Sequence, residues 1–172
     1  MPLEFAKTPS VRRSFFVNSI METRLKRILV PGEGVGTDHE SILLACALSK
    51  KDKSEILLLY VIEVRRNLPI DAEMSAEIEH GEMVLEKVQR FADKIGCRVQ
   101  TDLLQAREAG SAIVNEAVER DAQLVVMGVP YHEKFGEYAV TPRAQYVLEH
   151  AACRVILTRE ALSQGQSIVV EH

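Results

Sequence analysis

Short runs of apolar residues alternate along this chain with segments in which apolar residues recur every three or four positions. The runs predict five strands and the periodic segments predict four helices. The predicted strands are residues 27–31, 55–63, 97–104, 124–127 and 153–158, and the predicted helices are residues 37–50, 71–95, 111–120 and 139–151. This alternation, with a nearly all-apolar second strand, predicts an α/β fold: a doubly wound open sheet of five parallel strands with helices on both faces.

Several residues indicate where the predicted helices begin and end and which side faces the core. Thr37 and Glu40 match a capping box, with Thr37 as N-cap. Gly96 is a natural C-terminal cap, and Ser111 near Glu108 is typical of a helix cap. The periodicity also places a set of apolar side chains in the core: Val84, Val88, Phe91, Ala92 and Ile95; Ile113, Val114, Ala117 and Val118; and Met74, Met83 and Met127.

The length of 172 residues fits one domain, residues 24–160, with an N-terminal arm (1–23) and a C-terminal tail (161–172). The chain is 47% hydrophobic and 27% charged, which is ordinary for a globular protein. No apolar run has the roughly 18 residues of a membrane span. The three widely spaced cysteines, Cys46, Cys97 and Cys153, are typical of buried thiols in a reduced compartment rather than of a disulfide or zinc framework. We therefore expect a cytoplasmic protein.

The net charge of -4 is unevenly distributed. Residues 1–27 hold six basic and two acidic side chains, a net of +4, so the remainder carries -8. An acidic body argues against nucleic-acid binding. The basic arm is either a solvated leader or a segment that seeks an anionic partner.

Candidate chemistry gathers after the first and fourth predicted strands, because an open α/β sheet binds ligands where its winding direction reverses. Gly32, Gly34 and Gly36 alternate in the first of these loops, just before a helix whose backbone amides would attract an anion. Thr37 stands where a dinucleotide-binding motif has its third glycine, so an ordinary glycine turn is the alternative interpretation. The sequence has no P-loop, and we identify no catalytic pair and no metal-ligand spacing.

Four motifs occur in an order and spacing that resemble the universal stress protein family across residues 25–159. They are Val30-Pro31-Gly32-Glu33, Leu59-Tyr60-Val61, Ala122-Gln123-Leu124-Val125-Val126-Met127-Gly128 and His150-Ala151-Ala152-Cys153-Arg154-Val155. The resemblance implies an adenine-nucleotide pocket, with Glu33 at the place of an acid that contacts the nucleotide and Val61 lining the adenine site. Pro31, Met127, Gly128 and Thr141 would complete the pocket. It also implies a homodimer that pairs the last strands of two subunits.

The chain departs from the family at the phosphate loop, which has the pattern G-x2-G-x9-G-[S/T]. Its four marked positions fall here on Gly128, Tyr131, Thr141 and Pro142, so one glycine is kept and the hydroxyl is lost. Lys134 and Arg143 offer charge instead, and the aromatic residues of the loop suit a contact surface. We therefore expect weak or no ATP binding, with ATP or AMP as candidate ligands.

The leading hypothesis for function is a stress-response protein that acts by association, as a homodimer through residues 153–158, with a further protein partner as a second candidate. Residues 167–170 are a candidate extra edge or partner-binding strand, with a frayed terminus as the alternative. Three other hypotheses stay open at this stage: an adenine-nucleotide binder, a nucleotide-hydrolysing enzyme without an identified base, and a regulatory domain associated with a membrane transporter.

Overall fold

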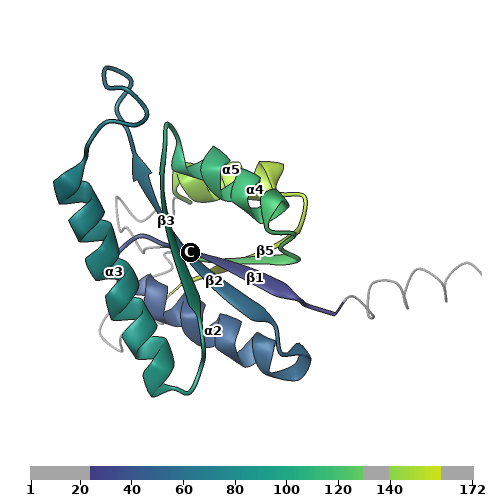
Figure 1. Cartoon of the computed structure of the whole chain (residues 1–172). Helices are drawn as coiled ribbons and strands as arrows, with labels where there is room; N and C mark the ends of the chain where they lie inside the picture. The colour runs from purple at the N-terminus through teal and green to yellow at the C-terminus, as the bar shows by residue number, and fades with distance from the viewer. Residues whose placement is uncertain (1–23, 130–139, 160–172) are drawn as a thin grey trace, which may run out of the picture.

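The computed structural model describes residues 24–129 and 140–159 (Figure 1). The predicted arm, the C-terminal tail and the loop with Tyr131 and Lys134 lie outside the described residues. Strands and helices alternate in the order β1 (Arg27–Gly32), α2 (Thr37–Asp52), β2 (Glu55–Glu63), α3 (Ser75–Lys94), β3 (Gln100–Ala106), α4 (Ala109–Glu119), β4 (Leu124–Gly128), α5 (Pro142–His150) and β5 (Arg154–Thr158).

The strands form one five-stranded parallel sheet in the order β3-β2-β1-β4-β5. Helices α2 and α3 cover one face and α4 and α5 cover the other (Figure 1). The predicted doubly wound α/β fold is thereby confirmed. The winding reverses between β1 and β4, which are neighbours in the sheet.

The apolar runs reflect burial of the central strands on both faces. In β1, Ile28 and Val30 pack into the cluster under α2 and α3, while Leu29 between them packs into the cluster under α4 and α5. All three are at most 1% exposed. Successive side chains of a strand point to opposite faces, so a strand covered on both sides has no polar position to alternate with its apolar ones.

The structure corrects two predicted helix caps. Gly36, not Thr37, is the N-cap of α2; Thr37 is its first helical residue and makes no capping hydrogen bond. Ser111 lies inside α4, whose N-cap is Glu108, and its hydroxyl donates to the Glu108 carbonyl. Both helices therefore begin without a hydroxyl cap of their own.

Three apolar side chains expected in the core are exposed. Ile95 is the C-cap of α3 and has left the helical face that Val84 and Val88 share. Met83 also lies off that face, and Val118 lies at the last turn of α4; they are 56% and 62% exposed. Each satisfies a loose helical periodicity but falls outside the stripe that touches the sheet, whereas Met74 and Met127 are buried as predicted.

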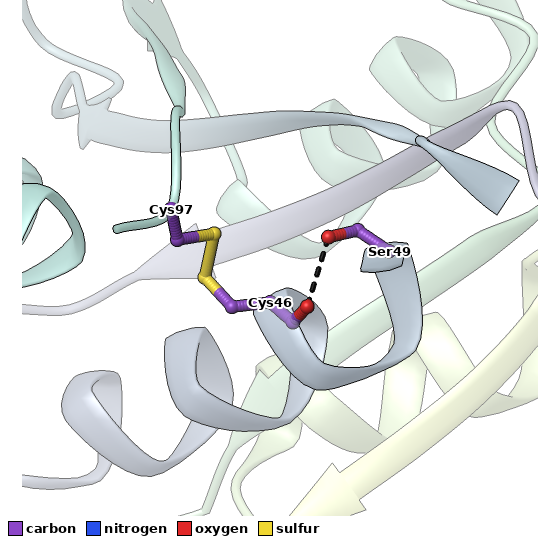
Figure 2. Close-up of a disulfide and its surroundings, with 3 residues drawn as sticks. All are labelled: Cys46, Ser49 and Cys97. Carbon is purple, nitrogen blue, oxygen red and sulfur yellow. Dashed lines mark hydrogen bonds between the residues drawn. A yellow bond between two sulfur atoms is a disulfide. The ribbon is translucent and has the colours of Figure 1, made fainter. Parts of the chain in front are cut away.

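The structure also corrects the cysteine prediction. Cys46 on α2 and Cys97, just after α3, form a disulfide with a Cα–Cα distance of 5.9 Å (Figure 2). Both residues are buried at the same side of the sheet, although they are 51 positions apart in sequence. The Ser49 hydroxyl donates to the Cys46 carbonyl at 2.9 Å beside the bond (Figure 2). Cys153 is a free, partly buried thiol.

No helix in the described ranges combines the length and the apolar character that crossing a membrane requires.

Candidate functional site

The glycine-rich loop that follows β1 is held by a carboxylate from within the chain. The Asp38 carboxylate accepts the backbone amides of Glu33 at 3.1 Å and Gly34 at 2.7 Å. Asp38 is 2% exposed, and burial raises the pKa of its carboxyl although the backbone amides act to lower it. Two amides of the glycine-rich loop are therefore already occupied by an internal carboxylate and are not open to an external anion.

Gly128, at the end of β4, faces the first residue of α2. A Cβ built on Gly128 would lie 2.5 Å from both Cβ and Oγ1 of Thr37 and 2.9 Å from the Thr37 carbonyl oxygen. The Thr37 hydroxyl is buried and has no hydrogen-bond partner among the described residues. Close packing of α2 against β4 is therefore a sufficient structural reason for glycine here.

The start of α5 has the chemistry of a helix cap. Thr141 is the N-cap, and its Oγ1 accepts the Ala144 amide at 3.2 Å. Pro142 follows at the first helical position, where its missing N–H is not needed by the helix. The two residues that replace a glycine and a hydroxyl of the family motif thus serve the helix itself.

An ion pair joins the loop after β1 to α5. A guanidinium nitrogen of Arg143 lies 3.1 Å from Oε1 of Glu33, and the two side chains are 25% and 19% exposed. The pKa of Glu33 is nevertheless raised above its ordinary value, first by burial and then by Asp38 and Glu63, against the opposing effect of Arg143. Desolvation therefore outweighs the attraction of the guanidinium at this carboxylate.

A cavity of about 440 Å³ opens beside this ion pair at the carboxyl end of β2. That volume is in the range of small-molecule sites. Burial raises the pKa of the Tyr60 hydroxyl at its wall. The lining residues come from β2, α3 and α5: Tyr60, Val61, Ile62, Glu63, Ala76, Glu77, His80 and Arg143.

The structure brings some of the sequence-predicted site residues together and buries others. Val61 lines the cavity, and Glu33 reaches its edge through Arg143. Pro31 and Met127 are buried in the sheet, and neither lines this cavity. Gly128 packs on Thr37, and Thr141 caps α5.

Sequence reasoning missed the roles of Asp38 and Arg143. Asp38 lay inside the sequence taken for a capping box, and a carboxylate within five residues of a glycine-rich turn was a signal for a loop anchor. Arg143 was noted as a source of charge, but no local pattern connects it with Glu33.

Among the described residues, no group of three or more His, Cys, Asp or Glu side chains has the arrangement of a metal site.

Comparisons with known proteins place the chain in a family. The model of the universal stress protein family matches residues 24–159. Universal stress protein MJ0531 of Methanocaldococcus jannaschii is 27% identical over 155 residues, which is 85% of this chain and 91% of that protein.

Two solved structures share the fold. A universal stress protein from Archaeoglobus fulgidus superimposes with a TM-score of 0.68 at 18% identity, covering 77% of this chain and 97% of that one. The universal stress protein of Archaeoglobus fulgidus in complex with dAMP gives a TM-score of 0.62 at 18% identity, covering 78% and 98%. With its doubly wound sheet and its match across residues 24–159, the chain belongs to the universal stress protein family.

Proposed function

We propose that this protein acts by association rather than catalysis, as a homodimer whose cavity beside β2 takes a small adenine ligand, adenosine or AMP, in preference to ATP. One observation supports the ligand preference: backbone amides of the candidate site already donate hydrogen bonds to side chains of this chain. The Asp38 carboxylate accepts the amides of Glu33 and Gly34. The Thr141 hydroxyl accepts the amide of Ala144, and Pro142 has no amide hydrogen to donate.

A triphosphate needs many more donors than a nucleoside does. Phosphate oxygens are strong acceptors, and binding sites for them are built from free backbone amides and cationic side chains. Here Arg143, the one Lys or Arg among the described residues that line the cavity, is already paired with Glu33. The dAMP complex of the Archaeoglobus fulgidus relative supports a ligand of the nucleoside or monophosphate class, since its fold is the same.

Titration calorimetry with adenosine, AMP and ATP tests the ligand preference. Each missing contact to a charged phosphate forfeits on the order of 1.5–3 kcal/mol. Two such losses weaken a micromolar ATP site by about two or more orders of magnitude. We therefore expect ATP to be the weakest of the three ligands, and an ATP dissociation constant at or below about 10 μM, roughly 7 kcal/mol, would contradict the proposal.

The apolar residues of the edge strand β5 support dimerisation through this strand. β5 presents partly buried Val155, Ile156 and Leu157, while the opposite edge strand, β3, begins with Gln100, Thr101 and Asp102 before its own partly buried Leu103 and Leu104. An apolar edge strand is a liability unless another chain covers it. The pairing of two β5 strands would remove that liability.

We expect Val155→Lys to convert the dimer to a monomer at tens of micromolar, because it places a charge on the edge strand. Val155 also packs against the cluster under α4 and α5, so circular dichroism checks that the variant is folded. Ile70→Lys introduces the same side chain at a 45% exposed position in the connection between β2 and α3, and it should leave the dimer intact. Light scattering coupled to size exclusion measures both variants. A monomeric wild type, or a dimeric Val155→Lys, would count against this interface.

A further inference from the structure

The cavity beside β2 has an unusual charge balance for a site that would bind phosphates. Arg143 is the one Lys or Arg among its described lining residues, while Glu63 and Glu77 bring two carboxylates. Glu63 is fixed in place, since its Oε1 accepts the Ala109 amide at 2.7 Å. The single cation is therefore the element that decides whether an anion is attracted or repelled.

That cation is not free. Glu33 approaches the Arg143 guanidinium from outside the lining, at 3.1 Å, and both side chains are mostly buried. A phosphate that recruited Arg143 would leave the Glu33 carboxylate in a desolvated place without its partner. Breaking a buried pair by removing one partner is strongly unfavourable, because an uncompensated charge stays behind. The pKa of Glu33 is raised because burial outweighs the attraction of Arg143, which agrees with this reasoning.

We propose that the Glu33–Arg143 pair is a specificity determinant of this cavity: while Glu33 holds the guanidinium, the cavity selects an uncharged nucleoside over its phosphorylated forms. The inference rests on the adenine-ligand function proposed above and narrows its ligand. The same pair keeps the cavity from recognising a phosphate, and neutralising Glu33 would free a guanidinium that lines the cavity.

Glu33→Gln tests the proposal directly, since it keeps the shape of the side chain and one acceptor oxygen and removes its charge. In the wild type, adenosine should bind more tightly than AMP. In Glu33→Gln, the affinity for AMP relative to adenosine should rise about tenfold or more, as expected when a charge-assisted contact is gained. The double variant Glu33→Gln/Arg143→Gln should lose that gain.

Glu77→Gln is the matched control, because Glu77 also lines the cavity but forms no ion pair with Arg143 in the described structure. It removes the same charge and should change the AMP-to-adenosine ratio much less. Calorimetry gives the ratios, and circular dichroism checks that each variant is folded.

The outcomes separate the two proposals. A wild type that binds AMP as tightly as adenosine, or more tightly, would overturn the specificity role and leave the adenine-ligand function standing. Equal ratios for Glu33→Gln and Glu77→Gln would also overturn it, since general electrostatics would then be the cause. Failure of wild type and Glu33→Gln alike to bind adenosine or AMP would overturn both proposals.

Discussion

Reduction of the Cys46–Cys97 disulfide should lower the free energy of unfolding by about 4 kcal/mol, the value expected when a cross-link closes a loop of this length. The two cysteines are 51 positions apart, so the bond constrains nearly a third of the chain in the unfolded state. In the folded state it ties the middle of α2 to the turn between α3 and β3 (Figure 2). Most of the stabilisation is therefore expected through the unfolded chain.

Urea unfolding with and without a phosphine reductant measures this effect on one sequence. The reduced protein should unfold at a lower midpoint and with a steeper denaturant dependence, because its unfolded chain exposes more surface without the cross-link. The double variant Cys46→Ala/Cys97→Ala should have the same urea midpoint with and without the reductant. Cys153→Ala removes the free thiol and should respond to the reductant like the wild type. Three reactive thiols in the unfolded, unreduced protein would show that the bond is absent.

The sheet could be predicted from the sequence because its signals are local. The segment Glu55–Glu63 is almost wholly apolar, and the structure makes it β2, with Leu58 and Leu59 at 0% exposure on opposite faces. Strand–helix alternation then leaves few topologies. The errors at Ile95 and Val118 lie at helix ends, where periodicity continues in the sequence after contact with the sheet has ceased.

The disulfide could not be predicted in the same way. An apolar pattern treats Cys46 as one more small core residue of α2, and its place there is correct. The disulfide of Cys46 depends on the position of Cys97 in the turn after α3, and tertiary packing determines that position. Reasoning from the odd number and wide spacing of the cysteines favoured free thiols, and the geometry of a single pair overrules such a compositional argument.

The contacts of the candidate site could not be predicted from the sequence. The sequence predicted a site in the loops after β1 and β4, whereas the cavity lies at the carboxyl end of β2 and meets the loop after β1 through the Glu33–Arg143 pair. The capping-box pattern predicts Thr37 as the N-cap of α2 and assigns no partner to the amides of the loop before it. In the structure, the two carboxylate oxygens of Asp38 accept the backbone amides of Glu33 and Gly34.

Gly128→Ala should destabilise the protein by about 3 kcal/mol, near the upper end of the usual cost of overpacking. The new methyl group would meet Thr37 at 2.5–2.9 Å, and one of the atoms it meets is the backbone carbonyl of Thr37. Rotation of a side chain cannot relieve that contact, so the first turn of α2 must shift away from β4. Gly32→Ala is the matched control at the end of the neighbouring strand, because its nearest contact is 3.5 Å from a leucine methyl, and it should cost far less.

A second substitution shows whether Gly128 is needed for packing or for a ligand. Thr37→Gly removes the Cβ and Oγ1 that the alanine methyl would meet, so the double variant Thr37→Gly/Gly128→Ala should be more stable than the sum of the two single losses predicts. Urea unfolding of the four proteins without ligand gives the coupling energy. If Gly128→Ala unfolded at the wild-type midpoint, the packing explanation would be wrong, and a role in ligand binding would become the better reason for glycine at this position.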